Sequence, residues 1–128
     1  MIAASEKDFK RFDSRSREQI AKLRQMIEQH QLQYVENIEV MENTFYSGYV
    51  DKKGKKCGYG VQSWPDQTKY EGEWHDNQAN GKGQLWCPNG DTYEGAWKND
   101  QANGFGYFKS MDGKKSYIGE WKDDLYHG

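Results

Sequence analysis

The chain has 128 residues, a formal net charge of -2 and an isoelectric point near 5.9. This length allows one ordinary domain with an appendage. The charge balance does not provide the basic surface that a phosphate backbone requires, so we expect no nucleic acid partner. The sequence contains no apolar run long enough to span a membrane and no signal peptide at its start, so we expect a soluble, cytoplasmic protein.

Two cysteines, Cys57 and Cys87, form no CxxC pair, and no histidine lies at ligand spacing from them. They predict reduced thiols, with no metal and no cofactor. His75 and His127 lack partners at triad or ligand spacing. The carboxylates of Glu71 and Glu73 are typical of a solvated strand face. We therefore expect no enzyme active site.

Composition divides the chain between residues 42 and 43. Residues 1–42 contain no glycine, whereas residues 43–128 contain all 14 glycines and 16 of the 19 aromatic residues. Large aliphatic side chains are few in this second part. Aromatic rings lying against glycine backbone must therefore supply most of its buried surface.

The first part predicts an amphipathic helix over about 16–41. Ser16 and Gln19 fit a capping box, and from Ile20 to Met41 apolar residues recur at spacings of three and four. Bases gather at the start of this segment and acids at its end, which opposes the helix dipole. We therefore expect the helix to be stabilised by a surface on which it lies.

The second part repeats two motifs in phase. The first motif occupies Tyr46-x-Gly48, Tyr70-x-Gly72-x-Trp74, Tyr93-x-Gly95-x-Trp97 and Tyr117-x-Gly119-x-Trp121, and its tyrosines step by 24, 23 and 24 residues. The second motif occupies Gly58-x-Gly60, Gly81-x-Gly83 and Gly104-x-Gly106. A fixed period of this kind indicates a stacked array.

Strand geometry explains the first motif. In a β-strand, Tyr70, Gly72 and Trp74 share one face, and the glycine between the rings leaves room for a neighbouring ring. We expect rings of one repeat to lie on glycines of the next. Six residues separate Trp74 from Gly81, and Pro88-Asn89-Gly90 is a turn signal for the other end, so each repeat is predicted to be a hairpin. The fold class is therefore mainly β, with the hairpins stacked into one elongated antiparallel sheet and an N-terminal α-helix beside it.

This pattern resembles the MORN (membrane occupation and recognition nexus) repeat family over residues 46–128. The resemblance implies a non-catalytic scaffold or adaptor that docks a partner's helix or extended segment on an aromatic and glycine groove, in a cytoskeletal or ciliary (axonemal) assembly. The predicted groove rings are Tyr46, Tyr70, Trp74, Tyr93, Trp97, Tyr117 and Trp121. Purely intramolecular packing is the alternative for each ring.

Several positions depart from the repeat. Val50 stands where the first copy should have tryptophan, as expected of a terminal repeat that acts as a cap. Gln67 occupies the place of Gly90 and predicts strain of roughly 1 kcal/mol if the turn is left-handed there. The last copy reaches Gly128 without a second strand, so we expect either further repeats or a partner at this edge. A single-layer sheet also leaves a face bare, on which we expect the N-terminal helix or a partner's helix to lie.

Two other functions stay open. Lys52, Lys53, Lys55 and Lys56 form a candidate contact for anionic lipid. Against a strong membrane role, residues 43–128 hold eleven bases and twelve acids. The resemblance also admits the non-catalytic N-terminal region of a larger enzyme, such as a phosphatidylinositol phosphate kinase.

Overall fold

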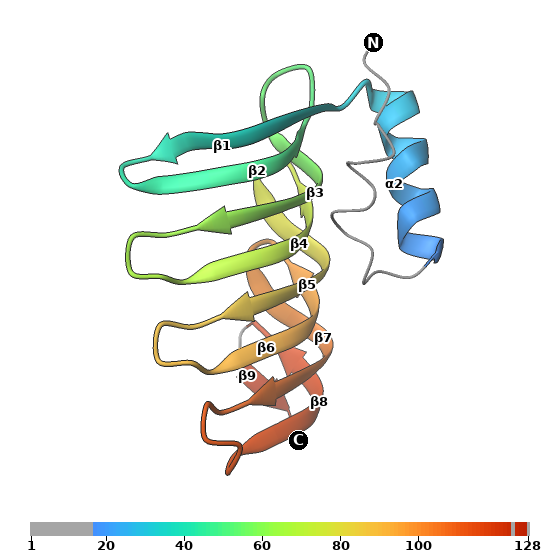
Figure 1. Cartoon of the computed structure of the whole chain (residues 1–128). Helices are drawn as coiled ribbons and strands as arrows, with labels where there is room; N and C mark the ends of the chain where they lie inside the picture. Colours follow the sequence, from blue (N-terminus) through green and yellow to red (C-terminus); the bar gives the residue numbers. More distant parts are fainter. Residues whose placement is uncertain (1–16, 124, 128) are drawn as a thin grey trace.

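A computed structural model describes residues 17–123 and 125–127 of the chain. Helix α2 (Arg17–His30) is followed by nine strands in one antiparallel sheet, whose spatial order follows the sequence (Figure 1). The predicted fold class is confirmed. The strands are β1 (Gln33–Met41), β2 (Thr44–Val50), β3 (Lys56–Ser63), β4 (Lys69–His75), β5 (Gln78–Trp86), β6 (Thr92–Lys98), β7 (Gln101–Lys109), β8 (Ser116–Lys122) and β9 (Leu125–His127).

The strand register places the motif glycines in one row across the sheet. Gly72 on β4 pairs with Gly60 on β3 and with Gly83 on β5. The same pairing continues to β8 through Gly95, Gly106 and Gly119. Because every strand from β2 to β8 contributes a residue without a side chain, one continuous strip of bare backbone crosses the sheet. Aromatic rings can approach the sheet closely along this strip.

Tight turns close each repeat at one end of its hairpin and bond the repeat before it. Asp76 and Asn77 join β4 to β5 with φ values of 52° and 69°, which is the left-handed pair of a type I′ turn. The Asn77 Oδ1 atom accepts a hydrogen bond of 2.8 Å from the Lys56 backbone N–H. One repeat later, Asp100 Oδ1 accepts a bond of 2.7 Å from the Ala79 N–H. Each of these turns is therefore held by the hairpin before it.

At the opposite end, Gln67 adopts the left-handed conformation that its alignment with Gly90 predicts. Its φ is 76°, compared with 92° at Gly90 and 74° at Gly113. Replacing Gln67 with glycine should raise the free energy of unfolding by roughly 0.5–1 kcal/mol, because relief of the left-handed penalty exceeds the entropy that glycine adds to the unfolded chain. Urea denaturation measures the change. The reverse substitution Gly113→Gln is the matched control and should destabilise by a similar amount, and a destabilising Gln67→Gly would contradict the prediction.

The prediction of a helix over 16–41 is wrong in its second half. Helix α2 ends at His30, Gln31 takes a left-handed φ of 53°, and residues 33–41 form β1, which pairs with β2. Tyr34 and Val35 favour a strand, and pairing with the open edge of β2 overrides the helical spacing. Ser16 of the capping box lies outside the described residues. The boundary at 42/43 consequently falls inside the β1–β2 hairpin.

The two ends of the array also differ from expectation. Strand β1 pairs with β2, so the first repeat is covered by a strand that the repeat pattern does not include. Val50, in the place of tryptophan, is buried in the aromatic core. At the other end, β9 pairs with β8 through Tyr126 and its neighbours. The last repeat therefore has a short second strand, contrary to the expectation that it lacks one.

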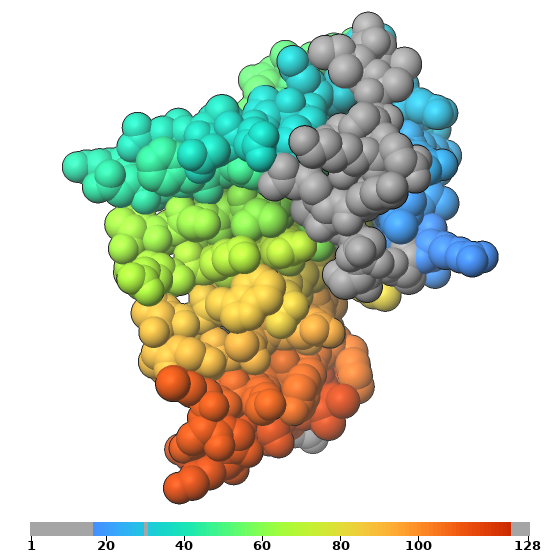
Figure 2. Space-filling view, viewed as in Figure 1, coloured from blue at the N-terminus to red at the C-terminus, as the bar shows by residue number. Residues whose placement is uncertain are grey.

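Helix α2 covers part of one sheet face, as the bare face of a single-layer sheet predicts. Leu23, Ile27 and Leu32 form a buried cluster with Tyr49, Cys57 and Tyr59. The view in Figure 2 places α2 beside the first hairpins and well away from the last repeats. The intramolecular form of the predicted helix contact is thus present, but it extends over the early strands only.

Candidate functional site

Tyrosine rings cover the glycine strip on one face of the sheet. A methyl group added at Gly83 would collide with the Tyr70 ring, and one added at Gly72 would meet the Tyr70 hydroxyl at 2.7 Å. The Tyr70 hydroxyl donates a hydrogen bond of 2.9 Å to the Glu73 carbonyl on its own strand. The other motif tyrosines donate in the same way, three residues along. Each ring therefore lies on the glycines of its own hairpin, which corrects the expectation that it lies on those of the next.

The tryptophans join one repeat to the repeat before it. The Trp74 Nε1–H donates a hydrogen bond of 3.1 Å to the Gly60 carbonyl. The Trp74 indole lies edge-on to Tyr46 and Tyr70, with ring centroids 5.6 Å and 5.1 Å apart. Trp97 and Trp121 repeat this arrangement with the carbonyls of Gly83 and Gly106. Tyrosine and tryptophan thus alternate in one ladder of edge-to-face rings, which favours stable packing.

The structure places the seven predicted groove rings in this ladder. Tyr46 is fully buried at 0% exposure, and Tyr70, Trp74, Tyr93 and Trp97 are also buried. Tyr117 and Trp121, in the last repeat, are half-buried. Burial raises the pKa of the Tyr46 and Tyr70 phenols, so both hydroxyls remain donors to their carbonyls. These rings form the core of the array. They pack against one another, so their contact surface is used within the chain.

The opposite face of the sheet carries an open groove of about 840 Å³. Trp86, Phe105 and Tyr107 provide its aromatic surface, and Glu71 and Glu94 provide carboxylates. Phe105 is 60% exposed and Tyr107 is 42% exposed. Large apolar side chains gathered in the open are typical of a contact surface for another molecule.

The groove was not predicted from the sequence, although the sequence contains an indication of it. Phe105 occupies the middle of Gly104-x-Gly106, where the first repeat has Tyr59. Motif residues between two glycines point to the face opposite the core rings. Aromatic residues at this middle position were therefore the available indication of a second apolar surface.

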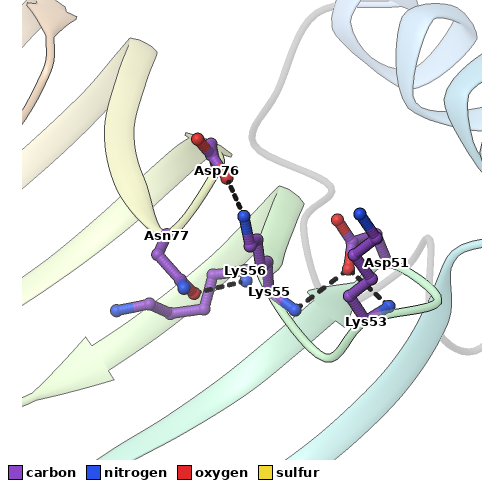
Figure 3. Close-up of polar contacts among 6 residues, drawn as sticks. All are labelled: Asp51, Lys53, Lys55, Lys56, Asp76 and Asn77. Atoms are coloured by element: carbon purple, nitrogen blue, oxygen red, sulfur yellow. Dashed lines mark hydrogen bonds and ion pairs between the residues drawn. The ribbon is translucent and has the colours of Figure 1, made fainter.

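The four lysines proposed for lipid contact do not form one anion site. The Lys55 amine pairs with Asp76 at 2.8 Å, and Asp51 Oδ1 accepts bonds from the backbone N–H groups of Lys53 and Lys55 (Figure 3). The hydrogen bond with Asp76 raises the pKa of Lys55. Lys52 and Lys53 lie exposed in the loop before β3. Two exposed side chains and one paired amine give a weak anion surface.

Lys56, the fourth lysine, turns into the aromatic core. Its amine lies 4.2 Å from the Trp74 ring centroid and donates a hydrogen bond of 2.6 Å to Gln62 Oε1. Burial lowers the pKa of this amine. The second repeat has Ala79 and Leu85 at the corresponding positions, and the third has Ala102 and Phe108. A polar pair thus replaces an apolar pair in the first repeat, and Lys56 is not available to a lipid headgroup.

The carboxylates considered for catalysis make structural contacts. Glu71 accepts a hydrogen bond of 3.0 Å from the Tyr59 hydroxyl, and Glu73 pairs with the Lys22 amine of α2 at 2.6 Å. Within residues 17–123 and 125–127, no three His, Cys, Asp or Glu side chains are arranged to hold a metal ion. In the same part of the chain, no helix has the length and apolar character needed to cross a membrane.

These features define a repeat protein built from stacked hairpins, in which the two complete central repeats each contribute one tyrosine, one tryptophan and a Gly-x-Gly strand. Comparison with protein families agrees: the MORN repeat model matches residues 46–69, 70–92, 93–115 and 117–128. The chain belongs to the MORN repeat family, whose repeats form a non-catalytic module.

Similar sequences occur in Alsin. The Alsins of Mus musculus, Pan troglodytes and Homo sapiens are each 33% identical to this chain over 82 residues. The match covers 60% of this chain and 5% of each Alsin. The chain therefore spans a small fraction of the length of these relatives.

Proposed function

We propose that the chain is a non-catalytic docking module, which binds an apolar segment of a partner protein on the open groove of its sheet. The observation that carries this proposal is the exposed aromatic surface of Phe105 and Tyr107, together with Ile118, which is 66% exposed and pairs with Tyr107 across β7 and β8. Burying three such side chains in a complex would supply much of the binding free energy that a typical interface draws from its hot-spot residues.

The groove takes the place of the core rings as the partner surface. The tyrosine and tryptophan ladder supports it from behind, because the two sets of side chains project from opposite faces of the same strands. A rigid support lowers the entropy that the surface loses on binding. The resemblance to MORN proteins leads us to place the partner in a cytoskeletal or ciliary assembly, and the much longer Alsins support the use of such repeats within large proteins.

Affinity capture from a cell extract tests the docking role. The full chain should capture a partner protein. The double variant Phe105→Ala and Tyr107→Ala should capture at least about tenfold less of it, since truncating each hot-spot ring costs more than about 1 kcal/mol of binding free energy. Met111→Ala is the matched control, because Met111 is 75% exposed in the loop between β7 and β8. Retention of the same proteins by all three chains, measured by quantitative mass spectrometry, would contradict the proposal.

A further inference from the structure

The contact between α2 and the sheet shows how this protein binds a helix. Leu23 and Ile27 lie in one buried cluster with Tyr59, the middle residue of Gly58-x-Gly60. The adjacent Lys22 places its amine 2.6 Å from Glu73, which pairs with Tyr59 across β3 and β4. On the sheet, an aromatic ring lies next to a carboxylate. On the helix, an apolar stripe that is buried with this ring lies next to an amine that pairs with the carboxylate. We refer to Tyr59, Val61 and Glu73 as the first helix seat.

The same arrangement recurs two repeats later. Phe105 is the middle residue of Gly104-x-Gly106, and Glu120 pairs with it across β7 and β8 as Glu73 pairs with Tyr59. Tyr107 takes the position of Val61. We refer to Phe105, Tyr107 and Glu120 as the second helix seat.

The two seats differ in what covers them. Tyr59 is buried beneath α2, whereas Phe105 is open to solvent. The repeat between them has Lys82 and Gln84 at the corresponding positions, so an apolar seat is not repeated there.

The second helix seat has room for a helix of its own. Tyr59 and Phe105 lie on strands four steps apart, which corresponds to about 19 Å at the usual strand spacing. Figure 1 shows α2 running across the strands, along the array, so helix length decides the fit. At about 1.5 Å per residue a helix of about 11 residues spans roughly 17 Å, and it fits on the second seat end to end with α2. The groove also begins at α2, because Gln19 in the first turn of α2 lines it together with Phe105 and Tyr107. The second seat is therefore continuous with an existing helix contact.

The charges around the second helix seat favour a basic partner. Glu71 and Glu94 line the groove, and Glu120 flanks Phe105. Lys82 is the basic residue among the groove-lining side chains. Glu120 is the residue paired with Phe105 itself, so a Lys or Arg on a partner that lies over this ring complements its carboxylate.

We propose that the partner segment of the docking module is an amphipathic helix with the chemistry of α2: an apolar stripe at i, i+3 and i+4 that packs on Phe105 and Tyr107, preceded by a Lys or Arg that pairs with Glu120. This inference rests on the proposed docking function and specifies its partner class. The helix is recognised by the sheet through the same contacts that hold α2 on the first seat.

A peptide with the α2 sequence of residues 20–30, which contains Lys22, Leu23 and Ile27, is the probe. A lactam bridge between positions 21 and 25, which are exposed on α2, holds it helical, because a free peptide of this length is largely unfolded in water. Fluorescence anisotropy measures its binding to the full chain. We expect saturable binding that Phe105→Ala weakens by at least about tenfold and that Met111→Ala leaves unchanged.

Charge reversal tests the basic residue separately. A peptide carrying Lys22→Glu should bind the full chain at least about tenfold more weakly, and Glu120→Lys in the protein should restore its binding. Circular dichroism of each variant confirms that the sheet is intact.

Each remaining outcome overturns a stated part of the inference. If Phe105→Ala abolishes binding but the charge substitutions have no effect, the docking surface stands and the requirement for a basic residue on the partner is wrong. Binding that ignores Phe105, or no binding at peptide concentrations up to about 1 mM, would remove the α2-like helix from the second seat. The extract experiment with the Phe105 and Tyr107 double variant still decides the docking function in that case, so the two failures are distinguishable.

Discussion

Replacing Gly83 with alanine is expected to lower the free energy of unfolding by about 3 kcal/mol or more, because the added methyl group overlaps the Tyr70 ring. The ring has little freedom to move. It is buried, its hydroxyl is bonded to the Glu73 carbonyl, and two indoles contact it edge-on. Relief of the overlap would therefore disturb two neighbouring repeats. Urea denaturation followed by tryptophan fluorescence measures the loss.

Gly54→Ala is the control for this substitution. Gly54 has a left-handed φ of 82°, but no atom lies within 4 Å of the methyl group that alanine would add. Its cost should be limited to the backbone penalty of about 1–2 kcal/mol. A Gly83→Ala variant no less stable than Gly54→Ala would show that the tyrosine ring does not require the bare strip of backbone.

Truncation of Trp97 to alanine is expected to cost about 3–5 kcal/mol. The indole lies edge-on between Tyr70 and Tyr93, with ring centroids 5.2 Å from each, and bonds the Gly83 carbonyl at 3.2 Å. Its removal leaves a cavity at the junction of two repeats and an acceptor without its donor. Thermal unfolding by circular dichroism should show a lower transition temperature, and the transition should broaden if the repeats uncouple.

Phe105→Ala is the control for Trp97→Ala, because it removes an exposed ring from the opposite face of the sheet. Surface substitutions of this kind usually change stability by less than about 0.5 kcal/mol. Equal losses in the two variants would contradict the assignment of the rings to a core and a docking face. The control also shows that the binding variant used above is folded.

The periodic part of the fold could be predicted from the sequence because its cause is local. Alternation along a strand places Tyr70, Gly72 and Trp74 on one face whatever surrounds them. The equal spacing of the motifs then fixes the hairpins in register. The left-handed turn at Gln67 followed in the same way from its alignment with Gly90.

The features that depend on the neighbouring strands could not be predicted in this way. Residues 33–41 carry both helical spacing and strand-forming side chains, and the open edge of β2 decides between them. Burial of the core rings likewise depends on which neighbouring repeat each indole contacts, and the spacing of the motif does not specify that repeat. The groove could not be predicted from the repeat because the residue between the paired glycines varies, from Tyr59 to Lys82 to Phe105, so the motif does not mark this face as apolar.

The tryptophan contacts also give the array a direction. Trp74, Trp97 and Trp121 all reach back to a glycine carbonyl of the preceding repeat. Removing a repeat at the β9 end therefore leaves the anchors of the earlier repeats in place, whereas removing one at the β1 end deprives its successor of an anchor. Such an array can gain or lose modules at its later end over evolution while its beginning stays intact.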